Sequence, residues 1–311
     1  MAGAPVSQCR RLPNLIIIGV AKAGTTSLFE YLAQHPDVCG ADEKELYYFS
    51  ASRFGEEIAP LESYADHFRH CTGERWVMEA TPGYFFGGVS TISHMQSVLG
   101  RPHLLLSLRD PVTRFYSYYA FHFGQGHLPS YLTPAGYLKE CLQLRADGRD
   151  GQREHIAYWG LSGGCYVDQL RSWSDAFGDR LHVVFLEHLK EDPQKMLAEI
   201  CEWAGIAKEA LPDIDVTAAN PSARYRSSTL RTLQLSVRER GAALRGRAPG
   251  VYRLAARAMR SVNATTAGIP ALDDATRRAL DDYYRDSNAR TGVLLRSRGY
   301  RNLPGWAGGS E

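Results

Sequence analysis

Continuous apolar segments, rather than segments that alternate between polar and apolar residues, mark the predicted strands of this chain. A short segment of this kind is typical of a parallel strand that is buried on both faces. Between these segments apolar residues recur at helical spacing, as at Val167, Leu170, Trp173 and Phe177. Strands that alternate with helices predict an α/β fold with a parallel sheet. The predicted strands are residues 15–18, 76–79, 103–108 and 181–186.

The first predicted strand leads into a glycine-flanked loop and then into a helix. Gly19 and Gly24 bracket the loop, and Lys22 lies inside it. Glycine lets a backbone approach a ligand closely, and the first amides of a helix attract an anion. We therefore expect a P-loop-type parallel sheet flanked by helices, in a single domain with a helical C-terminal portion. The expected anion contacts are Lys22, Ala23, Gly24, Thr25, Thr26 and Ser27.

The position of the lysine separates this loop from that of a nucleoside triphosphatase. In the motif G-x-x-x-x-G-K-[ST] the lysine follows the second glycine, whereas here Thr25 follows it and Lys22 comes earlier. A lysine inside the loop approaches a shorter anion, namely one phosphate and the group it carries. The loop alone leaves two other interpretations open, a degenerate kinase loop and a turn whose glycines serve only packing.

The segment after the strand at residues 103–108 bears on the kinase alternative. Asp110 can cap the following helix, and Pro111 can occupy its first turn. A kinase would use Asp110, at the end of a strand, to hold magnesium. Arg109, which precedes this acid, and Ser117, two turns into the helix, point away from that interpretation.

Together these motifs resemble those of sulfotransferases that use 3′-phosphoadenosine 5′-phosphosulfate (PAPS), above all the heparan sulfate N- and 3-O-sulfotransferases. G-x-x-K-x-G-T-T at residues 19–26 resembles their 5′-phosphosulfate loop, and L-R-D-P-x-x-R-x-x-S-x-Y at residues 108–119 resembles their 3′-phosphate site. The resemblance implies that Arg109 and Ser117 bind the 3′-phosphate. It also implies a phosphate contact from Arg224, in a loop similar to K-G-R-x-Y, and an enzyme that uses PAPS without a metal.

Glu45 is the expected catalytic base. By itself, the adjacency of Lys44 and Glu45 favours a solvated ion pair. The segment from Glu45 to Phe49, however, matches position by position a segment of the heparan sulfate branch in which the glutamate is the base. The resemblance implies that Glu45 removes the proton of the acceptor and that Lys22 neutralises charge on the departing phosphate.

Departures from the family pattern bear on the acceptor. Ala80 replaces a lysine in a segment similar to E-K-T-P-A-Y-F, and Ser222 replaces the lysine of the K-G-R-x-Y loop. We therefore expect a carbohydrate, glycolipid or small-molecule acceptor rather than a long free polyanion. The candidate acceptor contacts are Tyr84, His122 and Tyr166, with packing in the core as the alternative for His122.

The net charge of +2 is unevenly distributed along the chain. Residues 224–262 contain ten Arg and one Glu, and part of this segment forms a predicted amphipathic helix. A helix docked on the core and a peripheral contact with an anionic membrane both account for this pattern. A non-catalytic module that binds anionic ligands or membrane surfaces is a further alternative, whereas a nucleic-acid partner is not expected.

Cysteine usage and the termini complete the picture. The six cysteines are scattered without a C-x-x-C pair, which predicts neither a zinc site nor a disulfide framework. Residues 1–13 lack the apolar segment of a secretion signal. A cytoplasmic location therefore fits best, with peripheral contact at the inner membrane surface as an option. We expect tails at residues 1–13 and 307–311 around a catalytic domain at residues 14–306.

Overall fold

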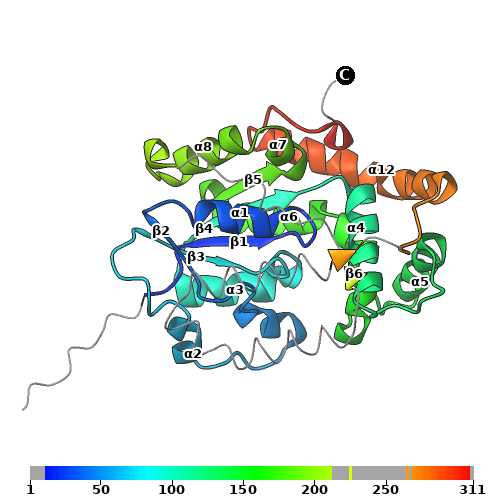
Figure 1. Ribbon diagram of the computed structural model, residues 1–311, viewed down its shortest axis with the longest axis horizontal. Coiled ribbons are helices and arrows are strands. Elements are labelled where there is room, and N and C mark those ends of the chain that lie inside the picture. Colours follow the sequence, from blue (N-terminus) through cyan, green and yellow to red (C-terminus); the bar gives the residue numbers. More distant parts are fainter. Residues whose placement is uncertain (1–10, 212–223, 226–263, 266–267, 309–311) are drawn as a thin grey trace, which may run out of the picture. The chain divides into compact units, whose positions relative to one another are not determined.

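A computed structural model describes residues 11–211, 224–225, 264–265 and 268–308 (Figure 1). Five strands form one parallel sheet in the order β2-β3-β1-β4-β5. These strands are β1 (Leu15–Gly19), β2 (Val38–Gly40), β3 (Trp76–Ala80), β4 (His103–Leu108) and β5 (Leu181–Phe185). The α/β fold with a P-loop-type parallel sheet is confirmed.

Helices and short 3₁₀ helices connect the strands. The α-helices are α1 (Thr25–Leu32), α2 (Leu61–Asp66), α3 (Gly88–Leu99), α4 (Pro111–Gly124), α5 (Pro134–Ala146), α6 (Val167–Phe177), α7 (Leu186–Glu191), α8 (Pro193–Ala204) and α12 (Asp274–Ser297). The 3₁₀ helices are η1 (Tyr48–Phe54), η2 (Tyr84–Gly87), η3 (Arg153–Tyr158), η4 (Ser162–Gly164), η5 (Gly178–Arg180), η6 (Lys208–Ala210) and η8 (Gly305–Ala307).

The central strand β1 shows why the apolar segments are continuous. All five of its residues are buried, because β3 and β4 flank it within the sheet and helices cover both of its faces (Figure 1). Leu15 and Ile17 pack into one apolar cluster with α1 and α8. Ile16 and Ile18 pack into the other cluster, with α3 and α6. Successive side chains of a strand point to opposite faces, so both faces need apolar residues.

The strand order places a ligand site at the carboxyl end of β1. From β1 the chain passes to β2 and β3 on one side of it, and then crosses to β4 and β5 on the other side. In open parallel sheets, ligands bind beyond the carboxyl ends of the strands, at the point where the strand order reverses. The loops that follow β1, β3 and β4 therefore surround the expected site.

The described residues fall into two compact units. The first contains residues 11–114, 163–211 and 281–308, and the second contains residues 115–162, 224–225, 264–265 and 268–280. The second unit holds α5 and a pair of two-residue antiparallel strands, β6 (Arg224–Tyr225) and β7 (Ala264–Thr265). Helix α4 is divided between the two units, because the first unit includes its residues up to Arg114 and the second begins at Phe115. The single domain expected at residues 14–306 stays a prediction.

The predicted basic helix cannot be compared with the structure. Of residues 224–262, only Arg224 and Tyr225 belong to the described part of the chain, so the helix lies outside it. Among the described helices, none is long and apolar enough to cross a membrane.

Candidate active site

The loop after β1 has the backbone of an anion cradle. Lys22 has φ 73°, and Gly24, the residue before the first turn of α1, has φ 79° and ψ 14°. A Cβ at position 24 would lie 2.7 Å from Cδ1 of Leu186. Glycine is thus required there both for its left-handed backbone and for close packing. The turn aims the first amides of α1, from Thr25 to Ser27, towards the loop.

Three side chains hold successive carbonyl groups of this loop. Arg114 Nε donates to Ala21 O at 3.1 Å, and Arg109 Nη1 donates to Lys22 O at 3.0 Å. Ser107 Oγ donates to Ala23 O at 2.5 Å. In a trans peptide unit the N–H points opposite to the C=O. Fixing these carbonyls therefore also fixes the amide directions of the loop.

Arg109 sits at the end of β4 in a braced turn. Its Nε donates to Thr113 Oγ1 at 3.0 Å, while its own carbonyl accepts from the Tyr166 hydroxyl at 2.8 Å. Glu187 Oε1 accepts from the amide of Asp110 at 2.8 Å. The two guanidinium bonds to Lys22 and Thr113 use two of its five N–H donors, so the group retains donors for an anion.

Asp110 serves as the cap of α4. Its Oδ1 accepts from the amide of Thr113 at 2.7 Å, the bond expected of an aspartate that precedes a helix. The structure thus confirms the capping role that the sequence predicts for this acid.

Glu45 follows β2 and reaches the end of β3. Its amide donates to Ala80 O at 3.0 Å, and its φ of 68° is left-handed. Lys44 Nζ lies 2.7 Å from Glu45 Oε1, and the Tyr47 hydroxyl donates to Oε2. Burial acts to raise the pKa of Glu45, but Lys44, Tyr47 and Lys22 outweigh it and hold the pKa below its ordinary value. Glu45 is therefore an ionised carboxylate at neutral pH.

Lys22 and Glu45 interact electrostatically. Burial, followed by the charge of Arg109, lowers the pKa of Lys22 to about 8, while the charge of Glu45 opposes this shift. The same attraction lowers the pKa of Glu45. The structure thus brings together the loop lysine, the expected base and Arg109 at the carboxyl ends of β1, β3 and β4.

The remaining predicted nucleotide contacts are placed as follows. Around the loop, Ala23 and Thr25 are buried, Ser27 is half-buried and Thr26 is exposed. Ser117 lies on α4 in the second unit, and Arg224 lies in β6 of the same unit. The structure does not relate these last two residues to the loop, so their phosphate contacts stay predictions.

The predicted acceptor contacts are buried. Tyr84 and Tyr166 are fully buried, and their hydroxyls contact Phe49 N and Arg109 O. His122 is buried in the second unit, where its Nδ1 lies 3.0 Å from Nδ1 of His127. Ala80 is also fully buried, in the cluster beneath α1. In this structure the two tyrosines brace the backbone, and the methyl group of Ala80 packs in the core.

A hollow of about 250 Å³ lies beside the Glu45 segment. Tyr48 and Tyr64 stack in its wall with 4.2 Å between ring centroids. Among the described residues that line it, Glu57 is the one acid and none is Lys or Arg. Such a wall suits an apolar or sugar face better than a polyanion. The lining residues are Leu46, Tyr47, Tyr48, Ala51, Glu57, Ala59, Ser63, Tyr64 and His67.

Two contacts at the site were not predicted from the sequence. Tyr47 occupies a position that the family pattern leaves variable. Its hydroxyl donates to Glu45, and both residues have left-handed backbone. Glu187 follows β5 at the same sheet edge, where its charge also acts on Arg109. The end of a parallel strand was the available signal for Glu187.

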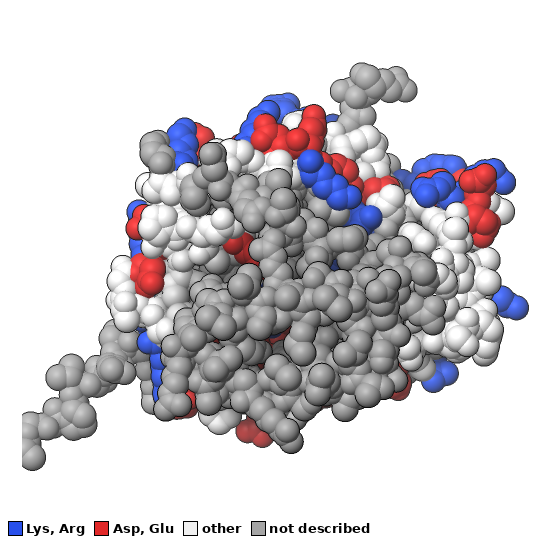
Figure 2. Space-filling model, viewed as in Figure 1, with Lys and Arg blue, Asp and Glu red and all other residues white. Residues whose placement is uncertain are grey.

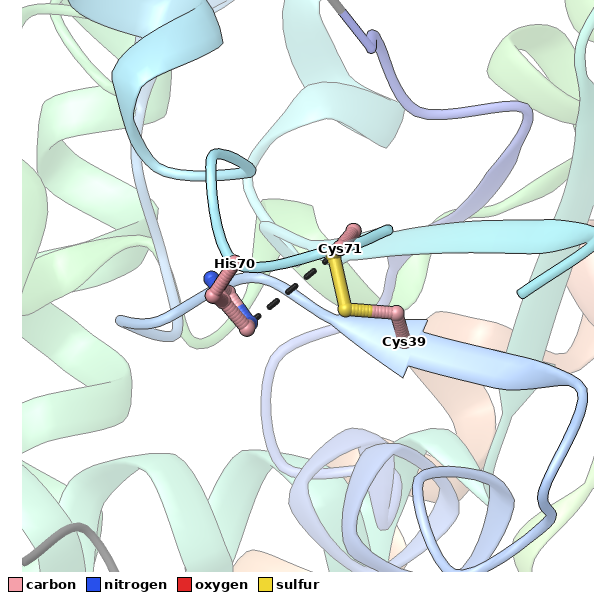
Figure 3. Close-up of side chains that lie close together, drawn as sticks. All are labelled: Cys39, His70 and Cys71. Atoms are coloured by element: carbon pink, nitrogen blue, oxygen red, sulfur yellow. Dashed lines mark hydrogen bonds between the residues drawn. A yellow bond between two sulfur atoms is a disulfide. The ribbon is translucent and has the colours of Figure 1, made fainter. Parts of the chain in front are cut away.

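The prediction that the cysteines are unpaired is wrong for Cys39 and Cys71. They form a disulfide, and His70 Nε2 lies 3.8 Å from Cys71 Sγ (Figure 3). Cys39 lies in β2, and Cys71 comes 32 residues later, just before β3. β2 and β3 are neighbours in the sheet, so the fold brings together cysteines that are distant in sequence. Within the described residues these three side chains also form a possible metal-binding group, but here the two sulfurs are bonded to each other.

Comparisons with known proteins identify the family to which this chain belongs. A family model described as "Sulfotransferase domain" matches residues 12–229. A bifunctional heparan sulfate N-deacetylase/N-sulfotransferase 1 from Caenorhabditis briggsae is 27% identical over 209 residues, 64% of this chain and 23% of that protein. A mouse heparan sulfate glucosamine 3-O-sulfotransferase 3B1 is 28% identical over 202 residues, 64% of this chain and 47% of its own length.

Two further similarities concern a membrane-associated protein and the fold. The membrane-associated sulfotransferase kil1 of Dictyostelium discoideum is 39% identical over 113 residues, 35% of this chain and 23% of that protein. A crystal structure of a sulfotransferase from Alicyclobacillus acidocaldarius matches with a TM-score of 0.67 and 23% identity, over 95% of this chain and 99% of the other. This chain spans less than half the length of the three curated relatives. Because the family model matches well over half of the chain, this protein belongs to the sulfotransferase domain family.

Proposed function

We propose that this protein transfers a sulfuryl group from PAPS to a hydroxyl or amine of a carbohydrate, glycolipid or small-molecule acceptor. The observation that carries the proposal is an ionised Glu45, held by Lys44 and Tyr47, whose charge acts on Lys22 in the loop after β1. An anion cradle with its own lysine and an adjacent carboxylate base provides both halves of such a transfer, a site for the donor and a group that activates the acceptor.

The residues present fit the donor. The loop lysine and the amides from Gly24 to Ser27 suit its 5′-phosphosulfate. The donors that Arg109 retains suit a second phosphate. Membership of the family supports PAPS as the sulfuryl donor, and we propose that Ser117 and Arg224 add contacts to its 3′-phosphate.

The chemistry assigned to the side chains is an in-line displacement. Glu45 takes the proton of the acceptor while the acceptor oxygen or nitrogen bonds to sulfur. The bond from sulfur to the bridging phosphate oxygen breaks, and its electrons stay on that oxygen. Lys22 stabilises the resulting charge, and the loop amides hold the phosphate in line. No oxidant or reductant is required.

The acceptor is proposed from the hollow beside Glu45. Its aromatic wall contains no Lys or Arg among the described residues, which favours a glycoside or a small molecule with an apolar portion. The printed names of two relatives specify heparan sulfate, but those matches cover less than half of each relative. We therefore base the proposed acceptor class on the lining of this hollow rather than on the names of the relatives.

Labelled donors test the proposed reaction. The purified protein is incubated with ³⁵S-labelled PAPS and, separately, with γ-labelled ATP, each with para-nitrophenyl glycosides, glycolipids and unsulfated heparan-type chains. We expect ³⁵S in a glycoside or glycolipid, equimolar formation of the 3′,5′-bisphosphate nucleotide, and no loss of rate with EDTA. Label from ATP that requires Mg²⁺ would identify a kinase. Binding of the bisphosphate nucleotide without any transfer would identify a non-catalytic module.

A membrane role is proposed for the basic segment at residues 224–262. The described surface of α12 does not supply a basic patch, because Arg285 pairs with Asp282, and Arg290 with Asp286 and Asp168. Figure 2 shows blue and red side chains intermixed there. We propose that the ten arginines of the segment contact anionic lipid, each contributing about 1 kcal/mol at low salt. Equal co-sedimentation with anionic and neutral vesicles at low salt would contradict this.

We propose that the protein is cytoplasmic and contacts the inner membrane surface peripherally through its basic segment. Disulfides are uncommon in the cytoplasm. The redox state of the Cys39–Cys71 pair in cells therefore tests this location. Thiol labelling of the protein in intact cells, before and after reduction, measures it directly.

A further inference from the structure

Glu79 is a carboxylate buried in the middle of the fold. It lies in β3 with no exposed surface. The Tyr64 hydroxyl donates to its Oε2 at 2.7 Å, and Thr81 Oγ1 donates to its Oε1 at 2.6 Å. The Tyr84 hydroxyl lies near the same carboxylate and favours its charged form. Burying a carboxylate is costly unless hydrogen bonds satisfy it, so the hydroxyls assembled around this acid indicate a structural role for it.

Two of these hydroxyls connect Glu79 to the segment that carries Glu45. The amide of Tyr47 donates to Thr81 Oγ1 at 3.3 Å, and the amide of Phe49 donates to the Tyr84 oxygen at 3.4 Å. A hydroxyl has one proton. Because Glu79 takes the proton of the Thr81 hydroxyl, the lone pairs of Thr81 Oγ1 are left to accept from the amide of Tyr47.

The connected segment has a backbone that needs support. Glu45 and Tyr47 both have left-handed φ values, 68° and 56°, although neither is glycine. Such conformations persist where the surroundings over-determine them, and they cluster at functional sites. The Tyr47 hydroxyl then donates to Glu45. Hydrogen bonds therefore link Glu79 through Thr81 to the backbone of Tyr47, and the side chain of Tyr47 in turn bonds to the proposed base.

We propose that Glu79 is a positioning residue, which acts through Thr81 and Tyr84 to hold the Glu45 segment in its left-handed, catalytically competent conformation. The proposal rests on the proposed function in that Glu45 is the base. It predicts that the hydroxyls of Thr81 and Tyr84 affect turnover more than donor binding, because the loop that binds the donor is held by other side chains, Arg109, Arg114 and Ser107.

A matched pair of variants at one position tests this. Thr81→Val keeps the shape of the side chain but removes the hydroxyl, whereas Thr81→Ser keeps the hydroxyl. We expect Thr81→Val to lower kcat by roughly 10- to 100-fold, the range for a small misplacement of a catalytic group. The KM for PAPS should stay within about threefold of the wild-type value. Thr81→Ser is expected to restore most of kcat.

Two further variants separate positioning from general destabilisation. Thr291→Val removes another fully buried threonine hydroxyl, which donates to Ser287 O in α12, and serves as the control. Tyr84→Phe cuts the second connection and should lower kcat in the same way. A wild-type kcat for Thr81→Val, or a fall in donor affinity as large as the fall in kcat, would overturn the proposal.

Amide hydrogen exchange keeps the proposal testable if the reaction is not sulfuryl transfer. Thr81→Val is expected to raise exchange in a peptide that covers residues 44–49, relative to the Thr291→Val control, without raising it in residues 19–27. If the wild type transfers no sulfuryl group, the proposed function fails while this measurement still decides the positioning role. Unchanged exchange at residues 44–49 would overturn that role.

Discussion

At the scale of single residues, the proposed reaction depends on a balance of charge between Lys22 and Glu45. Lys22 is largely buried, so its charged form needs a negative neighbour, which Glu45 provides. When Glu45 accepts a proton, that negative charge disappears. In the proposed reaction the departing phosphate gains negative charge in the same step, so Lys22 exchanges one counter-charge for another. This exchange favours the transition state over the ground state.

Replacement of the base tests the role of Glu45. Glu45→Gln is expected to lower turnover by roughly 10²- to 10⁴-fold, the range for a positioned general base, because the amide cannot accept the proton. Affinity for the 3′,5′-bisphosphate nucleotide, measured by calorimetry, should stay within a few-fold. Glu56→Gln, at an exposed acid on the following turn, is the control. A near-normal rate for Glu45→Gln would assign the base to another residue.

The dependence of kcat/KM on pH should have two limbs that belong to the free enzyme. Glu45 must be ionised and its pKa lies below the ordinary value, so kcat/KM falls only as the pH falls through that lowered pKa. Lys22 must be protonated, so kcat/KM falls as the pH rises through its pKa of about 8.

A variant at position 22 assigns the alkaline limb. Arginine stays charged across this range, so in Lys22→Arg the limb should move to higher pH, even if the maximal rate is lower. An alkaline limb that stays near pH 8 in this variant would belong to a different group.

At the scale of elements, neighbouring elements hold the conformation of the loop between β1 and α1. The carbonyls of the loop are held by Ser107 of β4, by Arg109 in the turn after β4 and by Arg114 of α4. Leu186 of α7 packs against Gly24. The anion cradle is therefore as rigid as the contacts between these elements. Its amides are oriented before a ligand arrives, which reduces the ordering cost of binding.

Two glycine substitutions separate backbone strain from close packing. Gly24 and Gly205 have similar left-handed backbones, with φ 79° and 71°. A Cβ added at position 24 would lie 2.7 Å from Leu186, whereas a Cβ added at position 205 would have no neighbouring atom within 4 Å. Gly205→Ala should cost about 1–2 kcal/mol of stability from the backbone alone. Gly24→Ala should cost more, as measured by urea unfolding, and should also weaken nucleotide binding. Equal effects of the two changes would show that Leu186 yields without cost.

At the scale of the whole molecule, the disulfide fastens the edge of the sheet near the proposed base. It joins β2 to the residue range that precedes β3. His67 Nδ1 also lies 2.7 Å from Asp42 Oδ1, and the amide of Asp42 donates to His67 O. These bonds join the residues before the Glu45 segment, Cys39 and Asp42, to residues that follow it, Cys71 and His67.

Reduction should therefore lower the thermal stability of the protein. Closing a loop of this length, with a sequence separation of 32, contributes about 3–4 kcal/mol in the chain-entropy model. We expect dithiothreitol to lower the Tm of the wild type by roughly 5–15 °C. The double variant Cys39→Ala/Cys71→Ala should melt at the lower temperature with or without reductant. A wild-type Tm that does not respond to reductant would show that the bond is absent in solution.

The sequence by itself determined the features that depend on local order along the chain. Continuous apolar strands, helical periodicity and the glycines around Lys22 identified the parallel sheet and the loop, because these patterns reflect burial and backbone freedom at neighbouring positions. The sequence also placed the cap Asp110 correctly, because a helix cap depends on residues that are adjacent in the chain. The role of Glu45 as a base is implied by the family motif and stays a prediction.

The tertiary structure alone decided which distant residues meet. The bond between Cys39 and Cys71, the hydroxyls around Glu79 and the burial of Tyr84 and Tyr166 depend on the order of strands in the sheet and on which side chains face inward. Parallel strands bring segments tens of residues apart to one edge, and no local pattern records that pairing. For the same reason, the electrostatic interaction between Lys22 and Glu45 depends on the fold, which brings the carboxyl ends of β1 and β3 side by side.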